Sequence, residues 1–489
     1  MTYWLYLIFI IFNLLFYFIC RVNKPPKELD FIPTVSFFKD ILILLRNGGQ
    51  LETQNLFREC DPNKIGLVKH YFFGWTIHIT NIEYAKLFLS ESAHNIPKTE
   101  MPPKTPLSIF YGKKGILVSN GDRWMQQRKI ASLAFNRTLR PDMVVECTNE
   151  FITLLNKWTD TPIDILSLSK RLTIQILGKL AFAYDMKALD SLEEQPYFLD
   201  IYNKIFQHVN NPFFMIFPFL NLLALKRNIE FSSLIKEFNK FILKMIEQRR
   251  LELSKEKNEN ENTDLLSGLL EAANHEEYNY TNKELRDHLV NYLIAGYDTT
   301  STSISIILYY LAKYPDIQKK ARDEVIKVLG SASNFITSEN LKDLKYLTAI
   351  IMESLRLYPP AALLVYRKPT KPFNLSENIT IPKGISVTVN FWQIHRNPDI
   401  WNDADKFIPE RFINPTKEIE NNWIPFSIGP RNCLGQNFSM MEQKVVIALT
   451  LLNFEMSFPP NAKHLDEIPL TKNFLLQPKK IDLIFSKLK

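Results

Sequence analysis

The residues from Phe426 to Gly435, Phe-Ser-Ile-Gly-Pro-Arg-Asn-Cys-Leu-Gly, restrict the possible folds of this chain more than any other part of its sequence. They have the form F-x-x-G-x-R-x-C-x-G, in which five positions are fixed. Because each fixed residue occurs about one time in twenty in average sequences, chance produces this pattern in well under about one chain in a thousand. A lone cysteine is usually an inert core residue. Here the pattern instead indicates that Cys433 is a ligand.

At these residues the sequence resembles the cytochrome P450 family, whose axial haem ligand is the cysteine of this loop. The resemblance implies that Cys433 binds the iron of haem b (iron protoporphyrin IX) as a thiolate and that Arg431 pairs with a haem propionate. Glycines such as Gly435 let the backbone approach the porphyrin, and Phe426 opens the same cofactor-binding loop. The family's motifs follow in order along essentially the whole chain. This implies the cytochrome P450 fold, which is mainly α with small β-sheets.

Composition excludes several other protein classes. A chain of 489 residues with 46% hydrophobic and 23% charged residues buries a large core, so it is neither disordered nor a disulfide-stapled miniprotein. None of the four cysteines belongs to a C-x-x-C pair, which argues against structural zinc. The net charge of +7 is spread without a dense basic stripe. We therefore expect no nucleic-acid partner, but a membrane surface or an acidic protein.

Residues 1–20 contain no charged side chain and are almost wholly apolar, which predicts one N-terminal transmembrane helix as an anchor. A cleaved signal peptide would have a basic start and small residues before its cleavage point, and neither is present. Residues 21–33 then form a basic, Pro-rich hinge, and residues 34–489 form the haem-binding catalytic domain. Three cations follow the apolar run: Arg21, Lys24 and Lys27. They predict a single-pass membrane protein, in the endoplasmic reticulum, with its catalytic domain facing the cytosol.

Amphipathic patterns predict helices through most of the body, while strand-like pieces are short. Helical patterns lie within Phe151–Trp158, Leu234–Arg250 and Leu285–Tyr314. Strand-like patterns lie at Trp75–Thr80 and Ile385–Phe391. The Lys-, Glu- and Asn-rich run Leu251–Thr263 predicts an exposed loop between helices.

Glu353 and Arg356 stand at i, i+3 spacing, which places a carboxylate and a guanidinium on one helical face. The same E-x-x-R pattern occurs at Glu247 and Arg250, where a solvated pair of little energetic value is the better explanation. Only the first pair is followed by a Pro-Glu-Arg-Phe segment, which contains Arg411. The resemblance implies a buried structural cluster of Glu353, Arg356 and Arg411 that locks the cysteine loop. Such a cluster must be complete, because an unpaired buried charge costs several kcal/mol.

The segment Ala295-Gly-Tyr-Asp-Thr-Thr interrupts a long apolar helix with residues that lower helix propensity without local gain. It matches the family pattern A-G-x-[DE]-T-[TS]. The resemblance implies that Ala295 and Gly296 leave room for the cofactor and that the catalytic residues Thr299 and Asp298 deliver protons to bound dioxygen. Ordinary packing around a tolerated glycine is the alternative. Fatty-acid ω-hydroxylases of this family carry a Glu in place of Ala295, through which haem can be attached, so Ala295 argues against that subclass.

Further cofactor contacts come from residues outside these motifs. Trp124 and Arg128 are four residues apart on one helical face and match the family's W-x-x-x-R, so they would address a haem propionate. The resemblance adds Arg367 as another propionate partner. His395 is the weakest candidate, because an isolated histidine is more often a structural residue.

The resemblance implies a haem-thiolate monooxygenase that uses O2 to hydroxylate a small lipophilic substrate: a sterol, fatty acid, terpenoid or xenobiotic. The cofactor oxidises, while the protein supplies ligand, proton path and pocket. No nicotinamide or flavin motif is present, so electrons must come from a separate donor of the NADPH-cytochrome P450 reductase type. Its docking face is expected to be basic, near Arg123, Lys129 and Lys444.

Two alternatives remain open. A haem-thiolate isomerase or lyase acting on peroxides would share Cys433 but would not need Asp298 and Thr299. A non-catalytic haem-binding membrane protein would show no NADPH-dependent oxidation. The apolar segment Phe213–Leu225 is too short to span a bilayer, and both core packing and contact with the membrane interface suit it. Substrate contacts are expected in residues 101–118, 205–223, 361–366 and 470–477.

Overall fold

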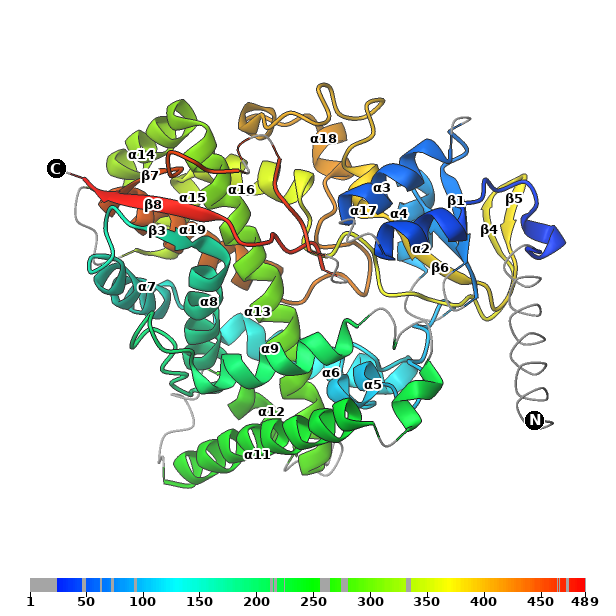
Figure 1. Cartoon of the computed structure of the whole chain (residues 1–489), viewed down its shortest axis with the longest axis horizontal. Coiled ribbons are helices and arrows are strands. Elements are labelled where there is room, and N and C mark those ends of the chain that lie inside the picture. The colour runs from blue at the N-terminus through cyan, green and yellow to red at the C-terminus, as the bar shows by residue number, and fades with distance from the viewer. Residues whose placement is uncertain are drawn as a thin grey trace, which may run out of the picture. The chain divides into compact units, whose positions relative to one another are not determined.

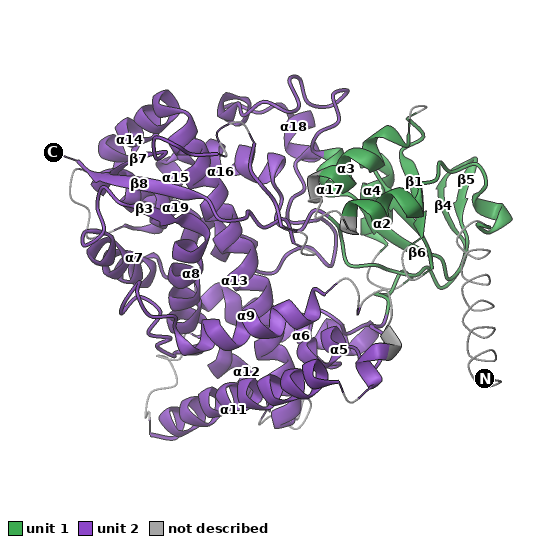
Figure 2. Cartoon of the chain, viewed as in Figure 1, with its two compact units in different colours: residues 1–99, 363–394 green, residues 100–362, 395–489 purple. Residues whose placement is uncertain are grey.

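The computed structural model describes residues 24–488 apart from short gaps, at 46–49, 62–63, 72–73, 92–94, 212–213, 215–217, 224, 256–263, 274–279, 331–335, 464, 466 and 472–474. Its contacts divide the chain into two compact units (Figure 2). Unit 1 comprises the chain up to Thr99 together with Leu363–Ile394, and unit 2 comprises Glu100–Ala362 together with His395–Lys489. The predicted anchor, residues 1–20, lies outside the described residues. None of the described helices combines the length and the apolar character needed to span a bilayer.

Unit 1 combines short helices with small sheets. Its elements are η1 (Lys27–Leu29), α2 (Phe37–Leu45), α3 (Gln50–Glu59), β1 (Leu67–Tyr71), β2 (Trp75–Ile79), α4 (Ile82–Ser90), β4 (Phe373–Ser376), β5 (Ile379–Ile381), β6 (Ser386–Val389) and α17 (Phe391–Ile394). The main sheet has the order β1-β2-β6, with β1 antiparallel and β6 parallel to β2. β4 and β5 form a separate antiparallel pair. The strands of the main sheet are almost wholly buried, as expected for strands rich in Val and Ile.

The first described residues are packed onto unit 1. Leu29 and Ile32 are buried, and the Lys69 ammonium donates to the Leu29 carbonyl at 2.7 Å. The backbone N–H of Lys69 donates to the carbonyl of Pro33 at 2.8 Å. Buried apolar side chains and backbone hydrogen bonds fix a segment in place. The packed body therefore includes Leu29, ahead of the expected boundary at residue 34.

Unit 2 is mainly helical. Its elements are α5 (Pro106–Tyr111), α6 (Gly121–Arg137), α7 (Pro141–Leu155), β3 (Pro162–Asp164), α8 (Ile165–Phe182), α9 (Tyr197–Val209), η2 (Pro218–Leu222), α11 (Lys226–Lys255), α12 (Leu265–Ala273), α13 (Asn282–Lys313), α14 (Pro315–Leu329), α15 (Ser338–Asp343), α16 (Lys345–Leu357), η4 (Pro409–Phe412), α18 (Lys417–Asn422), α19 (Gln436–Asn453), β7 (Phe454–Ser457) and β8 (Asp482–Lys487). The three strands form one antiparallel sheet in the order β3-β8-β7. The prediction of a mainly α fold with small sheets is confirmed.

Helix α13 runs through unit 2, where α8, α11, α16 and α19 pack against it (Figure 1). It begins at a capping box formed by Thr281 and Glu284 and stays buried along most of its length. It ends where Pro315 starts the next helix. A helix that is buried on nearly every face needs partners for each polar side chain. The places where α13 is exposed or polar are therefore informative about function.

The predicted elements are present, with differences at their ends. Leu285–Tyr314 falls almost entirely in α13, and Trp75–Thr80 in β2. The strand expected at Ile385–Phe391 ends at Val389, before the short helix α17. The loop predicted at Leu251–Thr263 is wrong at its start, because α11 continues to Lys255. Leu, Glu and Lys all favour helices, so a charged composition alone did not end this one.

Candidate active site

The cysteine loop is closed by its own backbone. The N–H of Cys433 donates to the carbonyl of Phe426 at 2.8 Å, and the N–H of Asn432 donates to that of Gly429 at 3.1 Å. Gly429 has a φ of 75° and Ser427 a φ of 59°. This left-handed region suits glycine, so the serine at 427 is mildly strained. Cys433 is thereby held just before the N-terminus of α19, where the helix dipole favours a negative charge.

The Cys433 side chain is exposed, yet it lies deep in the protein, where burial raises the pKa of its thiol. These two facts fit together if the sulfur borders an internal space instead of bulk solvent. The N–H of Gly435 and the charge of Arg128 oppose the rise in pKa and favour the thiolate. An accessible sulfur with a backbone N–H donor and a nearby cation is the environment that a metal-bound thiolate requires.

Two arginines lie near Cys433: Arg128 on α6 and Arg431 within the loop itself. Arg128 donates from Nη1 to the Asn432 carbonyl at 2.7 Å and from Nη2 to the Asn432 Oδ1 at 2.6 Å. Arg431 donates to the Ser119 carbonyl at 3.0 Å and to the Asn120 Oδ1 at 3.2 Å. All of these acceptors are neutral. Burial and the charge of Arg128 lower the pKa of Arg431 to about 10.

The arginine pair fits an anionic cofactor. Among the described residues, no acidic side chain makes an ion pair with Arg128 or Arg431. The buried Nε of Arg431 also has no hydrogen-bond partner. Adjacent like charges in a partly buried site are unfavourable without an anion, and carboxylates such as the haem propionates are the anions that guanidinium groups bind best. The residues present therefore fit the predicted haem.

Trp124 and Arg367 differ from this pair in their contacts. Trp124 is buried in α6, and its ring supports the guanidinium of Arg431. Arg367 is buried in unit 1, where its backbone pairs with Val387. Cys433 belongs to unit 2. The predicted contact of Arg367 with a propionate stays a prediction.

His395 has a structural set of contacts. Its Nε2 accepts a hydrogen bond from the Ile424 N–H at 3.0 Å, and its carbonyl accepts from Arg356 at 2.7 Å. Burial, together with the charges of Arg356 and Arg396, lowers the pKa of His395 to about 3. A neutral imidazole that accepts a backbone hydrogen bond is a structural residue, so the suggestion that it helps bind a propionate receives no support.

The α13 face that bears Ala295 and Thr299 is open. Ala295 is exposed and Thr299 half-buried, in a helix that is otherwise almost wholly buried. The Thr299 hydroxyl donates to the Ala295 carbonyl at 2.6 Å, which leaves its oxygen able to accept a proton from a bound group. In the next position, the Thr300 and Ser439 hydroxyl oxygens are 3.0 Å apart. This contact joins the open turn of α13 to the first turns of α19, just beyond Cys433.

Gly296 is explained by helix packing. A Cβ at this position would lie 3.1 Å from the Leu177 Cδ1 of α8. This distance is tighter than an ordinary van der Waals contact, so glycine lets α8 and α13 approach closely. The packing alternative therefore has direct support, and the role of Gly296 in leaving room for the cofactor stays a prediction.

Asp298 is the centre of a buried polar cluster. The Tyr202 hydroxyl donates to its Oδ2, the Gln477 amide donates to its Oδ1 at 2.9 Å, and the Lys170 ammonium is 3.7 Å from Oδ1. Burial raises the pKa of Asp298, while Lys170, Tyr202 and Gln477 oppose the rise. No hydrogen bond in the described structure joins the side chains of Asp298 and Thr299. The structure therefore gives the side chains of these two consecutive residues separate hydrogen-bond partners.

Lys170 connects this cluster to the surface. It lines, with Tyr297 and Asn203 among others, a solvent-facing pocket of about 190 Å³ between α8 and α9. The Lys170 side chain is 16% exposed, whereas that of Asp298 is 1% exposed. The Lys170 side chain thus borders both the buried carboxyl group and the surface pocket.

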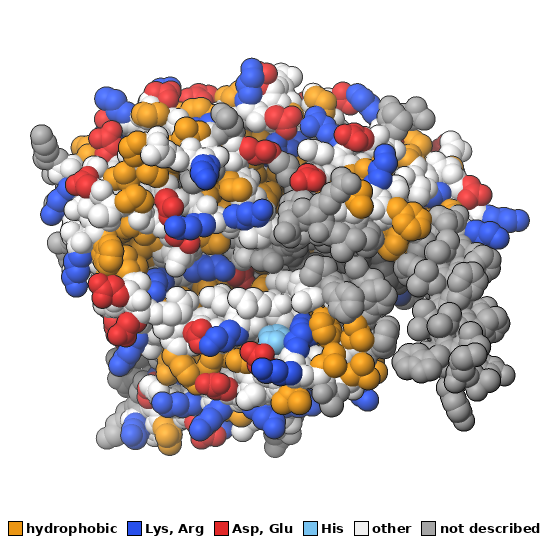
Figure 3. Space-filling model, viewed as in Figure 1, with side chains coloured by type: hydrophobic (Ala, Val, Ile, Leu, Met, Phe, Trp, Pro, Cys, Tyr) orange, Lys and Arg blue, Asp and Glu red, His pale blue; other side chains and the backbone are white. Residues whose placement is uncertain are grey.

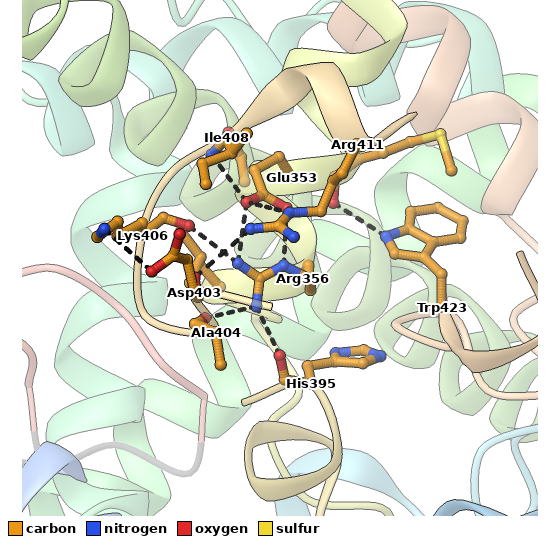
Figure 4. A network of polar contacts seen from close by, with 12 residues as sticks. Glu353, Arg356, His395, Asp403, Ala404, Lys406, Ile408, Arg411 and Trp423 are labelled. Atoms are coloured by element: carbon orange, nitrogen blue, oxygen red, sulfur yellow. Dashed lines mark hydrogen bonds and ion pairs between the residues drawn. The ribbon is translucent and has the colours of Figure 1, made fainter. Parts of the chain in front are cut away.

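Glu353, Arg356 and Arg411 are brought together as a buried cluster (Figure 4). The Glu353 carboxylate accepts from Arg356 Nε at 2.7 Å and Nη2 at 2.9 Å, and from Arg411 Nε at 3.0 Å. The other donors of Arg356 reach backbone carbonyls, those of His395, Ala404 and Lys406. Glu353 and Arg356 have no exposed surface. By contrast, Glu247 and Arg250 are 3.8 Å apart and 62% and 44% exposed.

The cluster adjoins the start of the cysteine loop. The Trp423 indole N–H donates to the carbonyl of Met352, the residue before Glu353, at 2.9 Å. The next backbone N–H, of Ile424, is held by His395. These hydrogen bonds connect the cluster to the residues that precede the cysteine loop. The predicted role of the cluster in locking the loop stays a prediction.

Several residues of the site had no signal in the sequence analysis. Tyr202 and Lys170 touch Asp298 from other helices, and no local pattern marks a contact across 96 residues. Asn432 stands at a variable position of the loop motif, yet it is the partner of Arg128. Its place between Arg431 and Cys433 is the one signal that could have drawn attention to it.

Comparisons with known proteins agree with the sequence. The family model described as Cytochrome P450 matches residues 43–485. Cytochrome P450 4Z1 of Homo sapiens is 32% identical, over 77% of this chain and 75% of its own length. The taurochenodeoxycholic 6 alpha-hydroxylase of Sus scrofa is 30% identical, over 78% of this chain and 76% of its own. The crystal structure of the cytochrome P450DA heme domain has a TM-score of 0.79 at 20% identity, covering 94% of this chain and 98% of that one. The predicted fold is thereby confirmed.

Proposed function

This chain belongs to the cytochrome P450 family, whose members are haem-thiolate monooxygenases, and we propose that it hydroxylates a small lipophilic substrate at a haem held by Cys433. One observation carries the proposal. The accessible Cys433 sulfur lies in a closed loop beside Arg128 and Arg431, two cations that have neutral partners only among the described residues.

Haem supplies the oxygen-activating chemistry when it is bound. The chain's own residues hold and orient it. Cys433 provides a thiolate favoured by the Gly435 N–H, and Arg128 and Arg431 provide counterions for the propionates. Asn432 fixes the direction of the Arg128 guanidinium through its carbonyl and side-chain oxygens. The haem propionates would therefore meet guanidinium groups whose positions are already fixed by the protein.

We infer that Thr299 and Asp298 would handle protons at the open face of α13. The Thr299 hydroxyl, whose one proton is donated to the Ala295 carbonyl here, can turn that proton toward a group bound at the open face of α13 and then accept another proton from the solvent side. The raised pKa of Asp298 lets its carboxyl group hold a proton at higher pH than an ordinary aspartate. Lys170 offers that carboxyl group an exchange path to the water of the surface pocket. Since no hydrogen bond joins the side chains of Thr299 and Asp298 in the described part of the chain, a water molecule would carry the proton between them.

A Cys433→His variant tests the haem assignment. The wild-type protein, reduced under carbon monoxide, should give the thiolate-type absorption band, and the variant should lose it while still binding haem. Cys147→Ser, which changes a buried cysteine in α7, should keep the band. A thiolate-type spectrum in Cys433→His would overturn the assignment.

The substrate class rests on the family and on the relatives. One of them is named a taurochenodeoxycholic 6 alpha-hydroxylase, which supports including compounds with a sterol skeleton among the substrates to test. Sterols, fatty acids, terpenoids and xenobiotics should be screened for a substrate-induced shift of the haem spectrum, then for oxidation in the presence of a reductase. If wild-type protein with a thiolate spectrum oxidises none of them, a peroxide isomerase or a non-catalytic haem protein replaces this proposal.

We propose that the electrons come from an NADPH-cytochrome P450 reductase-type partner that docks on a basic face. Of the three predicted contacts, Lys129 is exposed on α6. Arg123 is paired with Glu284, and the Lys444 ammonium donates to the Leu341 carbonyl at 2.9 Å. Lys129→Glu should therefore raise the KM for the reductase at low salt, and an unchanged KM would remove Lys129 from the docking face.

We also propose that the protein is single-pass in the endoplasmic reticulum membrane with its body facing the cytosol, because Arg21, Lys24 and Lys27 follow the apolar run. Protease added outside intact microsomes should digest the body. Full protection of the body would contradict this orientation.

A second membrane contact is proposed around η2 and the start of α11, where hydrophobic side chains gather (Figure 3). Leu222 is 64% and Ile229 62% exposed there. With residues 1–24 deleted, the haem-loaded body should bind liposomes, and Leu222→Ser with Ile229→Ser should weaken that binding. Leu133→Ser, at an equally exposed leucine of α6, is the control. Equal binding by the double variant and the wild type would contradict the contact.

A further inference from the structure

Helix α13 holds one short segment of the chain through a row of polar side chains. Glu284, Asp287 and Asn291 are buried and spaced three and four residues apart, so they share one helical face. All three bond to residues 111–120, the segment from the end of α5 to the start of α6, which is called the strut below. Glu284 also pairs with Arg123 and Thr281, and Asp287 with Arg286. Polar side chains are costly on a buried helix unless each makes its hydrogen bonds. Their presence in a row shows that the helix face is fitted to this segment.

The contacts are made mainly with the backbone of the strut. The N–H groups of Lys113 and Lys114 donate to the Asp287 Oδ2 at 3.0 and 3.1 Å. The Leu117 N–H donates to the Asn291 Oδ1 at 3.0 Å, and the Asn291 amide donates to the Tyr111 carbonyl at 2.9 Å. Two buried side chains thus satisfy four backbone groups that no regular secondary structure pairs.

Two glycines let the strut approach α13 this closely. A Cβ on Gly112 would lie 2.0 Å from the Asp287 Cγ, and a Cβ on Gly115 would lie 2.3 Å from the Asn291 Oδ1. Gly112 also has a φ of 76°, which favours glycine. Any larger residue would have to push the strut away from the helix.

The far end of the strut is held by the cysteine loop. Arg431 donates to the Ser119 carbonyl at 3.0 Å and to the Asn120 Oδ1 at 3.2 Å. Between its ends the strut is braced, because the Ser119 hydroxyl donates to the Gly115 carbonyl at 3.0 Å. The Gln127 amide of α6 donates to the Lys114 carbonyl at 2.8 Å. The strut is therefore a tied, internally bonded segment.

We propose that the strut sets the separation between α13 and the cysteine loop, and that Asp287 and Asn291 are its positioning residues. Asn291, Ala295 and Thr299 follow at successive intervals of four on α13, so the residue that grips the strut shares a face with the open positions. At the other end, Arg431 lies two residues before Cys433. The inference rests on the proposed function, because the separation between α13 and the cysteine loop matters only if haem binds between them.

Haem retention is the measurement that tests the strut. Asn291→Ala and Asp287→Ala remove its backbone contacts, and each should speed the transfer of haem to excess apomyoglobin by about tenfold, as expected for the loss of buried hydrogen bonds. The matched control is Gln318→Ala. Gln318 is also buried, and it holds the backbone of Met456 through two hydrogen bonds of 2.9 Å. Gln318→Ala should lower the melting temperature about as much as the two strut variants do, while its rate of haem loss stays within about twofold of the wild-type rate.

The conservative variant Asn291→Asp keeps the acceptor for the Leu117 N–H and loses the donor to the Tyr111 carbonyl, so its rate of haem loss should lie between the wild type and Asn291→Ala. If Asn291→Ala loses haem no faster than Gln318→Ala at equal melting temperature, the strut is ordinary packing and the inference is overturned. If Asn291→Ala does not fold, Asn291→Asp provides the test. Haem loss from Asn291→Asp at the wild-type rate would then overturn the inference. Absence of a thiolate spectrum from the wild type would refute the proposed function. Failure of the proposed function can therefore be told apart from failure of the strut inference, which leaves the wild-type spectrum intact.

Discussion

The guanidinium carbon of Arg431 lies 3.9 Å from the centroid of the Trp124 ring. Trp124 is buried and stands four residues before Arg128 on α6. One helix therefore positions both cations of the site: Arg128 through its own backbone, and Arg431 through the face of the indole ring, which attracts a guanidinium group. The W-x-x-x-R pattern works as a support for two charges that would otherwise repel.

Trp124→Leu and Trp124→Phe separate this support from simple packing. The leucine removes the aromatic face, which is worth about 2 kcal/mol to a desolvated cation, so the haem content of the purified protein should fall clearly. The phenylalanine keeps a ring and should lose much less. Haem content per protein and melting temperature are the measurements. Equal haem content in both variants would mean that Trp124 acts only as a core residue.

Residues within one motif were predictable, and residues joined across the fold were not. The spacing in F-x-x-G-x-R-x-C-x-G and E-x-x-R is local, so the sequence places those side chains on one loop or one helical face. Arg431 shows the limit, because its partners Ser119 and Asn120 are more than 300 residues away. Asp298 shows it again, since Tyr202 and Gln477 come from other parts of the chain. Such contacts depend on helix packing, which no spacing rule encodes.

The buried and the exposed E-x-x-R pairs provide a matched test of burial. Glu353→Gln removes the carboxylate shared by Arg356 and Arg411 at a point where Glu353 and Arg356 have no exposed surface, so the free energy of unfolding should fall by about 3–5 kcal/mol. Glu247→Gln changes the same pattern at the surface and should cost about 1 kcal/mol or less. Denaturant unfolding of both variants measures the difference. Similar losses of unfolding free energy in Glu353→Gln and Glu247→Gln would show that the buried pair stabilises the protein no more than the exposed pair does.

Thr299→Ala should uncouple electron use from product formation. The open hydroxyl is lost, while the i−4 hydrogen bond to Ala295 contributes little to helix stability. Haem content and the thiolate spectrum should therefore be retained, and a larger share of NADPH should end as hydrogen peroxide. Thr148→Ala is the control, because the Thr148 hydroxyl makes the same i−4 bond, to Val144 at 2.7 Å, in the buried helix α7. Unchanged coupling in Thr299→Ala would exclude the proton role.

Asp298 should make stability depend on pH with a sign opposite to that of an ordinary paired aspartate. Burial raises its pKa above 3.8, so the folded protein binds this proton more tightly than the unfolded chain does. The contribution of Asp298 to the free energy of unfolding is therefore most favourable below the unfolded pKa. It falls as the pH rises from that value through the raised pKa of the folded state, and then stays low.

The variant Asp298→Asn keeps the shape of the side chain and removes its titration, so the difference in melting temperature between wild type and variant isolates this one group. As the pH is raised from about 4 to about 8, the wild type should lose stability relative to Asp298→Asn. Asp142→Asn is the control of opposite sign. Because Arg140 lowers the pKa of Asp142 below 3.8, the wild type should gain relative to that variant as the pH rises from about 2 to about 4, and the difference should stay level above that range. A difference for Asp298 that is flat, or that rises with pH, would show that Tyr202, Gln477 and Lys170 outweigh burial, and that the carboxyl group holds a proton no better than an ordinary aspartate does.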